Sequence, residues 1–561
     1  MSGAARTELE RDTGDRLLVG RLDDVHEVEP TENGPLRHDL GSQLLHLFVD
    51  LPQALGVVFE RLHALGGQGA QHDERRHQRP PSIDSTRRAE SRVRCRWRPL
   101  LPAGWQQPHQ RVSVGATVPH TRTTRRAPGS AAVIADTLSA ALDRDPPVAV
   151  RFWDGSLLPG RDEGSDLPTV VVRSPRALAA LVREPSQLGL ARAWASGLVD
   201  VEGDLEEALR RGFLAFRDEP WRPSWPQRLR LVTVVARAVG VGALLADLTS
   251  AGRHSLEARL RGRRRSLGRD RAAVRHHYDV SNDFYRLILG PTMVYSCAYF
   301  ERDDEPLESA QERKLDLVCR KLALAPGERF LDIGCGWGSL VVHAASRYGA
   351  RALGITLSEP QAELARERAR EAGVADRCEI LVADYRELRR GEFDKVASIG
   401  MYEHVGRERL GEYVRRVRDL LRPGGLFLNH GIARLRPIDP GPDTFIRRYV
   451  FPDGDLHPLG YLVRELEQAD FELVDVESLR EHYPLTLRCW RANLEREFAT
   501  ATTLVGEERA RIWRLYLAAS AVGFECGEIT VFQTLAARRG ADHGLPRFRR
   551  RWLAGSVPAS V

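Results

Sequence analysis

One short segment near the middle of the chain combines residue types that can bind a small ligand. Residues 330–333 are an apolar run typical of a buried parallel strand, and the glycines that follow it are spaced by two: Gly334, Gly336 and Gly338. Glycines let the backbone turn sharply and leave no side chain between it and a ligand. Asp332, near the end of the strand, can accept hydrogen bonds from an ammonium or hydroxyl group of that ligand.

The spacing of these glycines indicates the kind of ligand. A dinucleotide-binding fingerprint has one more residue before its third glycine and cradles a pyrophosphate. The pattern Asp-x-Gly-x-Gly-x-Gly instead suits a ligand without phosphate, such as S-adenosylmethionine. Residues 339–345 then take up helical spacing, so a helix N-terminus faces the same point. The segment alone leaves open a strand-to-helix turn that binds nothing.

The elements that must position this loop alternate between strand and helix, as in a doubly wound α/β sheet. The expected strands cover residues 352–357, 379–383, 395–400, 426–432, 472–476 and 528–535, and the expected helices cover 359–371, 409–421, 461–469, 487–499 and 510–521. Ligands of such sheets bind outside the carboxyl ends of the strands. Polar residues are therefore expected together at that edge: Asp332, Thr356, Asp384, Glu403 and His430.

Composition bounds the class of protein. The 561 residues suffice for two or three domains, and the net charge of +6 favours an anionic surface of phospholipid or nucleic acid. The basic residues are arginines except for Lys314, Lys321 and Lys395. The seven scattered cysteines contain no Cys-x-x-Cys pair, so we predict neither disulfides nor a metal site, and a cytoplasmic location. No apolar run approaches a membrane span and no leader pattern opens the chain, so a soluble protein is expected.

Four regions flank the expected catalytic core at residues 276–540. Residues 1–130 are rich in Arg, His, Thr and Pro, so we expect disorder or a start assigned too far upstream, and a protein beginning at Ala131 should fold and act. Residues 131–251 are expected to form a small α+β, lipid-associated domain with a helix capped by Asp204, and a purely structural role of this domain is left open beside lipid capture. Residues 541–561 are expected to form a tail. Residues 252–275 are an arginine-rich linker, either solvated or touching an anionic bilayer. No nucleic-acid partner is expected, because residues 1–130 lack interleaved aromatic residues.

Seven segments in order along the chain resemble one family, the cyclopropane fatty acid synthases and their mycolic acid relatives. They are HHYDVSNDFY (276–285), YSCAYF (295–300), LDIGCGWG (331–338), ITLSEPQ (355–361), MYEHVG (401–406), NHGI (429–432) and YPLTLRCW (483–490). The resemblance covers about residues 131–540 and is strongest from 270 to 495. It implies a Rossmann-like class I methyltransferase fold and S-adenosylmethionine as the methyl donor.

The resemblance also implies a reaction. The cis double bond of an unsaturated acyl chain in a membrane phospholipid attacks the methyl group of S-adenosylmethionine and leaves a carbocation on the chain. Loss of a proton from the new methyl group then closes a cyclopropane ring. An alkene is a poor nucleophile, so the site must hold both groups in line without water. A cytoplasmic protein with this substrate is expected at the inner face of the membrane, and its oligomeric state, a homodimer included, is left open.

In the resembled family a bound bicarbonate takes that proton. The motifs place its ligands at Cys297, Glu403, His430, the Ile432 backbone and Tyr483. Bicarbonate needs hydrogen-bond donors, and the Glu403 carboxylate can accept its O–H. This sequence has Gly431 where the family often has Thr, which leaves the direction of the Ile432 backbone open.

The motifs place the cofactor as well. By resemblance its contacts fall on Tyr295 and Ser296 at the methionine end, Gly334 and Gly336 beneath it, Thr356 and Gln361 near the ribose, and Asp384 and Tyr385 near the adenine. Asp332 and Gly338 complete the glycine turn. A generic methyltransferase carries an acid for the ribose at the end of the second strand, and whether Glu359 reaches back to that place is left open.

Two alternatives remain. A hydride shift and proton loss from the same cation would give a methylene branch, which a partner reductase could convert into a 10-methyl branch, and residues 449–454 and 478–483 look similar to actinobacterial relatives of that type. A lipid-binding protein with an inactive methyltransferase fold would need the bicarbonate residues to be broken, and all five are present. Acyl length, double-bond position and head group are not indicated by the sequence.

Overall fold

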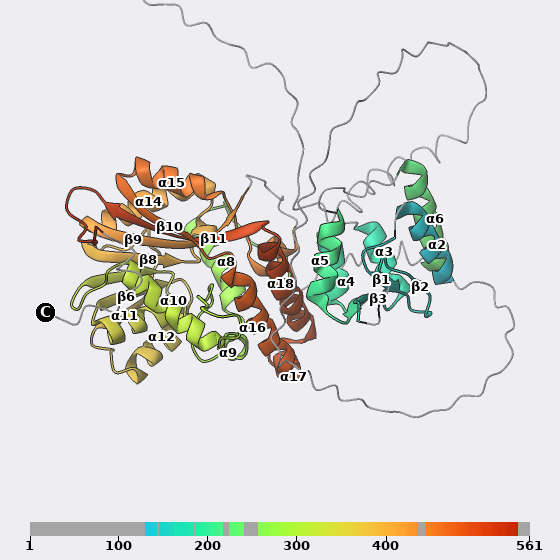
Figure 1. Ribbon diagram of the computed structural model, residues 1–561, viewed down its shortest axis with the longest axis horizontal. Helices are drawn as coiled ribbons and strands as arrows, with labels where there is room; N and C mark the ends of the chain where they lie inside the picture. Colours follow the sequence, from blue (N-terminus) through green and yellow to red (C-terminus); the bar gives the residue numbers. More distant parts are fainter. Residues whose placement is uncertain are drawn as a thin grey trace, which may run out of the picture. The chain divides into compact units, whose positions relative to one another are not determined.

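The computed structural model describes residues 130–142, 145–162, 164, 166–184, 186–216, 224–239, 256–435 and 444–547. All of them belong to the same unit, residues 39–561, and Figure 1 shows their helices and strands. The expectations for residues 1–129 and for the end of the tail fall outside the described residues. Within the described ranges, no helix combines the length and the apolar composition that crossing a membrane requires.

Seven strands of the described chain form the central sheet, in the order β10-β11-β9-β8-β5-β6-β7. They are β5 (Arg329–Ile333), β6 (Arg351–Thr356), β7 (Cys378–Val382), β8 (Phe393–Ile399), β9 (Leu421–Arg434), β10 (Phe471–Ser478) and β11 (Ile529–Arg538). Strands β5 to β9 pair in parallel, whereas β11 runs against both β9 and β10. The chain leaves β5 towards β6 and returns to β8 on its other side, so the ligand-binding switch point lies between β5 and β8. The predicted doubly wound sheet is confirmed.

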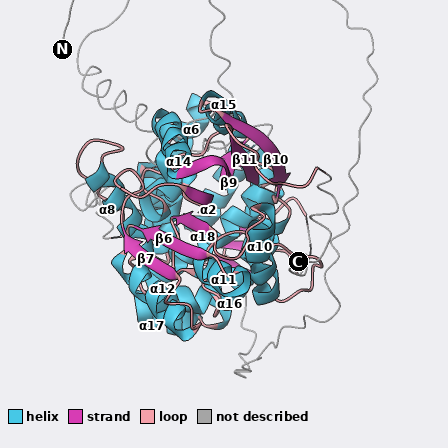
Figure 2. Ribbon diagram, turned by 90° about the vertical axis from the view of Figure 1, so that its left-hand side faces the viewer, coloured by secondary structure: helices cyan, strands magenta, loops and turns pink. Residues whose placement is uncertain are grey.

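Helices cover both faces of this sheet (Figures 1 and 2). One face packs α10 (Leu307–Lys321), α11 (Ser339–Tyr348) and α12 (Glu359–Glu371), and the other packs α14 (Leu410–Leu420) and α15 (Leu459–Gln468). The apolar residues of α14 recur at helical spacing and are all buried: Leu410, Tyr413, Val414, Val417 and Leu420. This stripe explains why an arginine-rich segment forms a stable helix, since one face of it is apolar.

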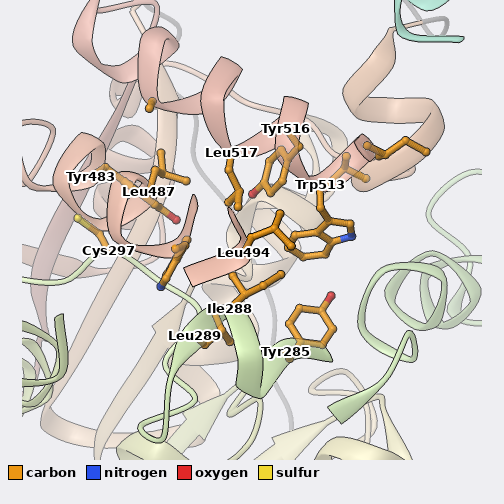
Figure 3. Packing of buried hydrophobic residues seen from close by; sticks show 14 of the residues in the cluster. Tyr285, Ile288, Leu289, Cys297, Tyr483, Leu487, Leu494, Trp513, Tyr516 and Leu517 are labelled. Atoms are coloured by element: carbon orange, nitrogen blue, oxygen red, sulfur yellow. The ribbon is translucent and has the colours of Figure 1, made fainter. Parts of the chain in front are cut away.

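A second group of helices builds the apolar cluster beside the sheet. It consists of α8 (Leu267–Tyr278), α9 (Asn282–Leu289), α16 (His482–Arg496), α17 (Phe498–Val505) and α18 (Glu507–Glu525). Figure 3 shows Ile288 of α9, Leu494 of α16 and Trp513 of α18 meeting in this cluster. Burial of several aromatic side chains here supplies a large share of the hydrophobic stabilisation of the domain.

Of the predicted element boundaries, those of α16 and β9 differ most from the structure. The helix expected at 487–499 begins at His482 and ends at Arg496, because Pro484 is tolerated in a first helical turn, where its missing N–H has no partner to lose. The strand expected at 426–432 begins five residues earlier, since β9 starts at Leu421 directly after α14. The ladder to β8 is irregular at that point, where Phe393 pairs with Leu421 and Lys395 pairs with Leu426.

The region before the core forms the expected α+β fold. Its strands pair in the order β2-β1-β3-β4, and they are β1 (Ala149–Arg151), β2 (Leu157–Leu158), β3 (Thr169–Val172) and β4 (Val199–Glu202). Its helices are α2 (Ser130–Leu142), α3 (Pro175–Arg183), α4 (Gln187–Ala195), α5 (Leu205–Phe216) and α6 (Trp225–Val239). Asp204 caps α5 as predicted, since its Oδ1 accepts a hydrogen bond from the Glu206 backbone N–H at 2.9 Å.

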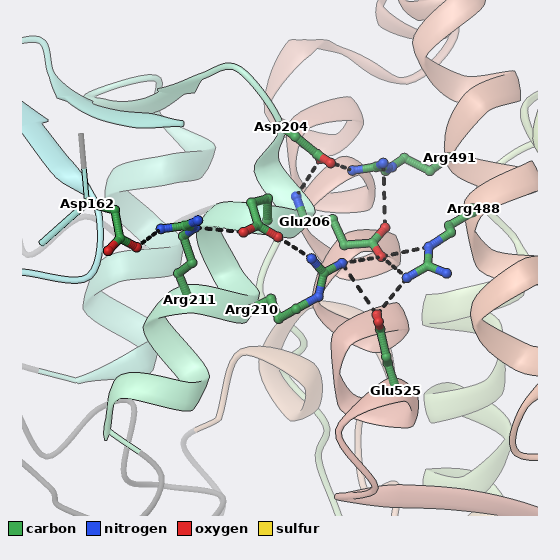
Figure 4. A network of polar contacts seen from close by, with 9 residues as sticks. Asp162, Asp204, Glu206, Arg210, Arg211, Arg488, Arg491 and Glu525 are labelled. Carbon is green, nitrogen blue, oxygen red and sulfur yellow. Dashed lines mark hydrogen bonds and ion pairs between the residues drawn. The ribbon is translucent and has the colours of Figure 1, made fainter. Parts of the chain in front are cut away.

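Charged residues join α5 to the helices of the core (Figure 4). Buried Glu206 accepts from Arg488 Nε at 2.7 Å, and the same guanidinium donates to Glu525 at 2.6 Å. Arg491 donates to Asp204 at 3.1 Å. Because several charges share partners, this network is more than a set of isolated surface pairs.

The arginine-rich linker is not uniformly solvated. Arg265 is buried and donates to the His404 carbonyl at 2.9 Å, and Arg269 is paired with Asp453 at 2.5 Å. The linker also becomes helical at Leu267, where α8 begins. Its inward arginines therefore fasten the linker to the core beside residues 401–406.

Candidate functional site

A cavity opens at the carboxyl edge of the sheet, at the switch point between β5 and β8. Its walls come from the loop after β5, the ends of β6, β7 and β8, and helices α8 and α10. Nine of the residues predicted to bind the cofactor line it: Tyr295, Ser296, Asp332, Gly334, Gly336, Thr356, Gln361, Asp384 and Tyr385. The sequence prediction therefore converges on one place in the structure.

Gly338, the tenth predicted residue, lies outside the lining. A Cβ atom there would approach the Ala365 Cβ of α12 to 2.8 Å, and its φ of +81° is left-handed. Its role is to let α11 start close to α12. Gly334 and Gly336 are also left-handed, with φ of +83° and +54°, but they face the cavity.

Asp332 presents an unpaired charge to the cavity. Its side chain is 2% exposed, and its Oδ1 has no hydrogen-bond partner among the described residues. Burial raises the pKa of Asp332 to about 7, against the opposing effect of the Lys314 ammonium. A buried carboxylate without a partner is costly, so a cationic ligand group would be stabilised beside it.

Other polar groups of the cavity wall are already hydrogen-bonded to one another. Thr356 Oγ1 donates to Gln361 Oε1 at 2.7 Å, which fixes the Gln361 amide near the glycine turn. Asp384 accepts two hydrogen bonds from Arg386, at 2.8 and 2.7 Å, so its carboxylate is already engaged. Glu359 pairs with Arg366 and does not line the cavity, which answers the question left open by the sequence.

Tyr295 is held in the cavity wall by a chain of hydrogen bonds. Its hydroxyl lies 3.2 Å from His277 Nε2 and 3.1 Å from the Tyr516 hydroxyl on α18. Burial lowers the pKa of His277 well below its ordinary value, so this imidazole is neutral. These hydrogen bonds therefore fix Tyr295 in the cavity wall without adding charge to it.

The five residues predicted to bind an anion lie around the cavity but do not line it. Glu403 stands in the short helix α13 (Tyr402–Val405) after β8, and its Oε1 accepts the Ile432 N–H at 2.7 Å. Its Oε2 is buried without a partner in the described part of the chain. Burial raises the pKa of Glu403 to about 7, although the Ile432 hydrogen bond opposes this.

The direction of the Ile432 backbone, left open by the sequence, follows from Gly431. A Cβ atom on Gly431 would lie 2.4 Å from Cδ1 of Tyr402, so the tyrosine ring occupies the space of a side chain. The Ile432 N–H then points at Glu403. It was expected to bind the anion directly, but in the structure it donates to the carboxylate.

His430 supplies a second unpaired buried atom. It pairs across the sheet with Gln533, whose Nε2 lies 3.4 Å from its Nδ1, and its Nε2 has no partner among the described residues. Burial lowers the pKa of His430 well below its ordinary value, so the ring is neutral. When Gln533 donates to Nδ1, the ring hydrogen resides on Nε2, which is then a donor.

Cys297 and Tyr483 lie in the apolar cluster of Figure 3. The Cys297 thiol points at the Ala298 and Leu479 carbonyls, at 3.3 and 3.6 Å, and burial raises its pKa, so it is not a nucleophile. Tyr483 stacks on Phe524 with ring centroids 4.2 Å apart. Burial also raises the pKa of Tyr483, so its phenol stays protonated.

The sequence reasoning missed Lys314 as a site residue. It lines the cavity from α10, is 2% exposed and donates to Ser296 Oγ at 2.7 Å. A compositional signal was present, since only three basic residues of the chain are lysines. All three, Lys314, Lys321 and Lys395, are buried.

Comparisons with known proteins agree on one group. The family model described as mycolic acid cyclopropane synthetase matches residues 265–534. A probable fatty acid methyltransferase of Pseudomonas putida is 40% identical over 412 residues, which cover 71% of this chain and 94% of the relative. The cyclopropane-fatty-acyl-phospholipid synthase of Escherichia coli is 37% identical over 271 residues, covering 48% and 69%. The solved structure of the cyclopropane synthase MmaA2 from Mycobacterium tuberculosis is 34% identical with a TM-score of 0.46, covering 48% and 98%.

Proposed function

Because the chain belongs to the family of cyclopropane-fatty-acyl-phospholipid and mycolic acid cyclopropane synthases, which are S-adenosylmethionine-dependent methyltransferases, we propose that it methylates unsaturated acyl chains. The proposed substrate is the cis double bond of an acyl chain in a membrane phospholipid, and the proposed product is a cyclopropane ring. A methylene branch, converted to a 10-methyl branch by a partner reductase, is the competing product.

The observation that carries the proposal is the cavity at the switch point, where Asp332 Oδ1 at the glycine turn is buried without a partner in the described part of the chain. S-adenosylmethionine supplies an electrophilic methyl group and carries positive charge in its amino-acid part. Asp332 would bind the ammonium, while Thr356 and Gln361 would bind the hydroxyls of the ribose. Asp384 is held by Arg386, so its place near the adenine depends on that pair.

The anion-binding residues would act after methyl transfer. Bicarbonate would supply a base small enough to reach the proton of the new methyl group. Glu403 Oε2 would accept its O–H, and His430 Nε2 and the Tyr483 hydroxyl would donate to its oxygens. This assignment is supported by Glu403 Oε2 and His430 Nε2, which are buried without partners among the described residues. The Ile432 N–H would orient it indirectly, through Glu403.

The linker surface supports the proposal of a peripheral protein at the inner face of the membrane. Arginines at positions 259, 261, 263 and 264 are exposed, and Leu267 beside them is 38% exposed. Exposed arginines attract anionic lipid head groups, each by about 1 kcal/mol near the surface, and an apolar side chain can enter the interface.

The proposal is tested by measuring whether turnover of the cofactor requires a double bond in the lipid. Purified protein is incubated with S-adenosylmethionine and vesicles of dioleoylphosphatidylglycerol, and release of S-adenosylhomocysteine is measured. Vesicles of dimyristoylphosphatidylglycerol carry the same head group without a double bond and serve as the control. We expect S-adenosylhomocysteine to be released only in the presence of the unsaturated lipid. Equal release in the presence of either lipid would refute the proposed substrate.

A further inference from the structure

One charged group of the cavity has no part in the function proposed above. Lys314 lies on α10 and reaches the cavity wall, although most of the surface of that helix that faces inward is apolar. In a chain that otherwise uses arginine, a buried lysine marks a place where a compact ammonium group fits. A buried charge of this kind needs compensation.

The hydrogen bonds around Lys314 leave donors available on the cavity side. Its ammonium has three N–H groups, and the described structure gives one acceptor, Ser296 Oγ at 2.7 Å. Lysine cannot accept a hydrogen bond, so the O–H of Ser296 must donate elsewhere, and no acceptor for it is found among the described residues. Both residues line the cavity.

Asp332 carries the opposite charge in the same wall. The structure records no ion pair between Asp332 and Lys314, yet each acts on the other electrostatically at longer range. The cavity wall thus carries a negative and a positive charge, each with unused hydrogen-bonding capacity. The ligand chemistry that matches this arrangement is a zwitterionic α-amino acid, whose ammonium and carboxylate are attached to one carbon atom.

We infer that Lys314, together with Ser296, binds the carboxylate of the amino-acid end of S-adenosylmethionine, while Asp332 binds its ammonium group. This inference rests on the proposed function and adds to it a basis for specificity among cofactor analogues. The site distinguishes cofactor molecules by the presence of the α-carboxylate, and it rejects analogues that have lost it.

The competing explanation is structural: Lys314 would balance the charge of Asp332 without touching a ligand. Ligands that differ by one group separate these explanations. S-adenosylhomocysteine has both the ammonium and the carboxylate, its decarboxylated analogue keeps the ammonium alone, and 5′-methylthioadenosine has neither. Calorimetric titration of each ligand gives an affinity that does not depend on turnover.

The wild-type protein should bind S-adenosylhomocysteine about 10–100-fold more tightly than the decarboxylated analogue, the range expected for a charge-assisted hydrogen bond. In Lys314→Met this preference should fall to about twofold or less, with the affinity for the decarboxylated analogue retained. Ser296→Ala, which keeps the charge, should lose part of the preference. Asp332→Asn should weaken both amino-bearing ligands and spare 5′-methylthioadenosine.

Lys321→Met is the matched control, because Lys321 is on the same helix, is 1% exposed and pairs with Glu477 away from the cavity. It should leave all three affinities unchanged. The inference is overturned if the wild type binds both amino-bearing ligands equally, or if Lys314→Met weakens all three ligands alike. Failure of the wild type to bind S-adenosylhomocysteine at all would instead overturn the proposed function.

Discussion

Glu403 acquires its properties from two segments that are distant in the sequence. It follows β8 in α13, and the N–H that fixes its Oε1 comes from Ile432 of β9. Its other oxygen is buried without a described partner, and burial raises its pKa to about 7. Burial, with a further contribution from the Glu403 charge, raises the pKa of Tyr278, which lines the cavity. A carboxyl group with these properties can orient an anion next to the cavity.

The titration of Glu403 predicts a pH-dependent stability. The folded-state pKa of about 7 lies above the ordinary value of 4.5, so the folded protein binds a proton that the unfolded chain releases. The contribution of Glu403 to stability therefore falls as pH rises from about 4.5 to about 7. Glu403→Gln removes this titration. The stability of the variant relative to wild type, followed by melting temperature, should therefore increase from pH 5 to pH 8, by up to about 3 kcal/mol.

Exposed Glu408 provides the control for that experiment. Glu408→Gln should melt with the same pH profile as the wild type. Parallel profiles for wild type and Glu403→Gln would contradict the raised pKa of Glu403.

Gly431 predicts a second single-residue effect. Gly431→Ala places a methyl group against the ring of Tyr402, whose hydroxyl donates to the His457 carbonyl at 3.1 Å. Overpacking of this kind costs about 1–3 kcal/mol, which urea denaturation can measure. Gly460→Ala, at a helical glycine with open space around it, should be neutral or stabilising. Equal effects of the two substitutions would show that the Tyr402 contact is unimportant.

The residues that line the cavity were predictable because their place at the ends of parallel strands can be read from the sequence. Asp332 and Thr356 lie at strand ends and Asp384 just after one, and parallel strands bring their carboxyl ends to one edge. The partner of the Ile432 N–H was not predictable, since it depends on the approach of Glu403 from another segment. Lys314 was missed because its helical position resembles that of the residues that face the core.

Among the elements, α18 connects the two folded regions of the chain. Arg511 on this helix is buried and donates to the Trp194 and Val199 carbonyls at 2.8 and 3.0 Å, and the Trp194 indole donates back to its carbonyl at 2.8 Å. The same helix carries Tyr516, which bonds to Tyr295 in the cavity wall. One rigid helix therefore contacts both the α+β region and the site.

Removal of the Arg511 side chain should destabilise this connection. Arg511→Ala removes a buried guanidinium that donates to two carbonyls and pairs with Asp200, and it is expected to cost about 2–4 kcal/mol in urea denaturation. Arg514→Ala, on the same helix, breaks a partly exposed pair with Glu495 and should cost about 0–1 kcal/mol. Similar costs for both variants would argue against a structural role of the Arg511 contacts.

Element types were easier to predict than their ends. The strands from β5 to β8 have apolar runs of the correct length with glycine or polar residues after them. β9 was predicted too short because Pro423, Gly424 and Gly425 are typical of a turn, whereas the pairing of Leu421 and Leu426 with β8 places them within one irregular strand. α16 was started late because Pro484 is read as a break.

For the molecule as a whole, the sequence predicted the α+β region and the methyltransferase core as separate folds. It did not predict their contacts, because the ion pairs of Figure 4 that join the two regions connect distant residues, such as Arg488 and Glu206 at a sequence separation of 282. No local pattern carries that information. The arginine-rich linker was likewise ambiguous, since the same composition suits a solvated segment, a lipid contact and the inward pairs observed.

The fate of the methyl group of S-adenosylmethionine is the most direct test of the proposed function. The protein is incubated with dioleoylphosphatidylglycerol vesicles and S-adenosylmethionine that carries a trideuterated methyl group, and the fatty acid methyl esters are analysed by gas chromatography and mass spectrometry. Transfer of CD₃ and loss of one deuteron should add one carbon with two deuterium atoms, at the retention time of a cyclopropane standard. The same mass at the retention time of a methylene-branched standard would assign the competing product. An unaltered oleate ester would contradict the proposed reaction. A product ester that has gained one carbon with all three deuterium atoms would contradict it as well.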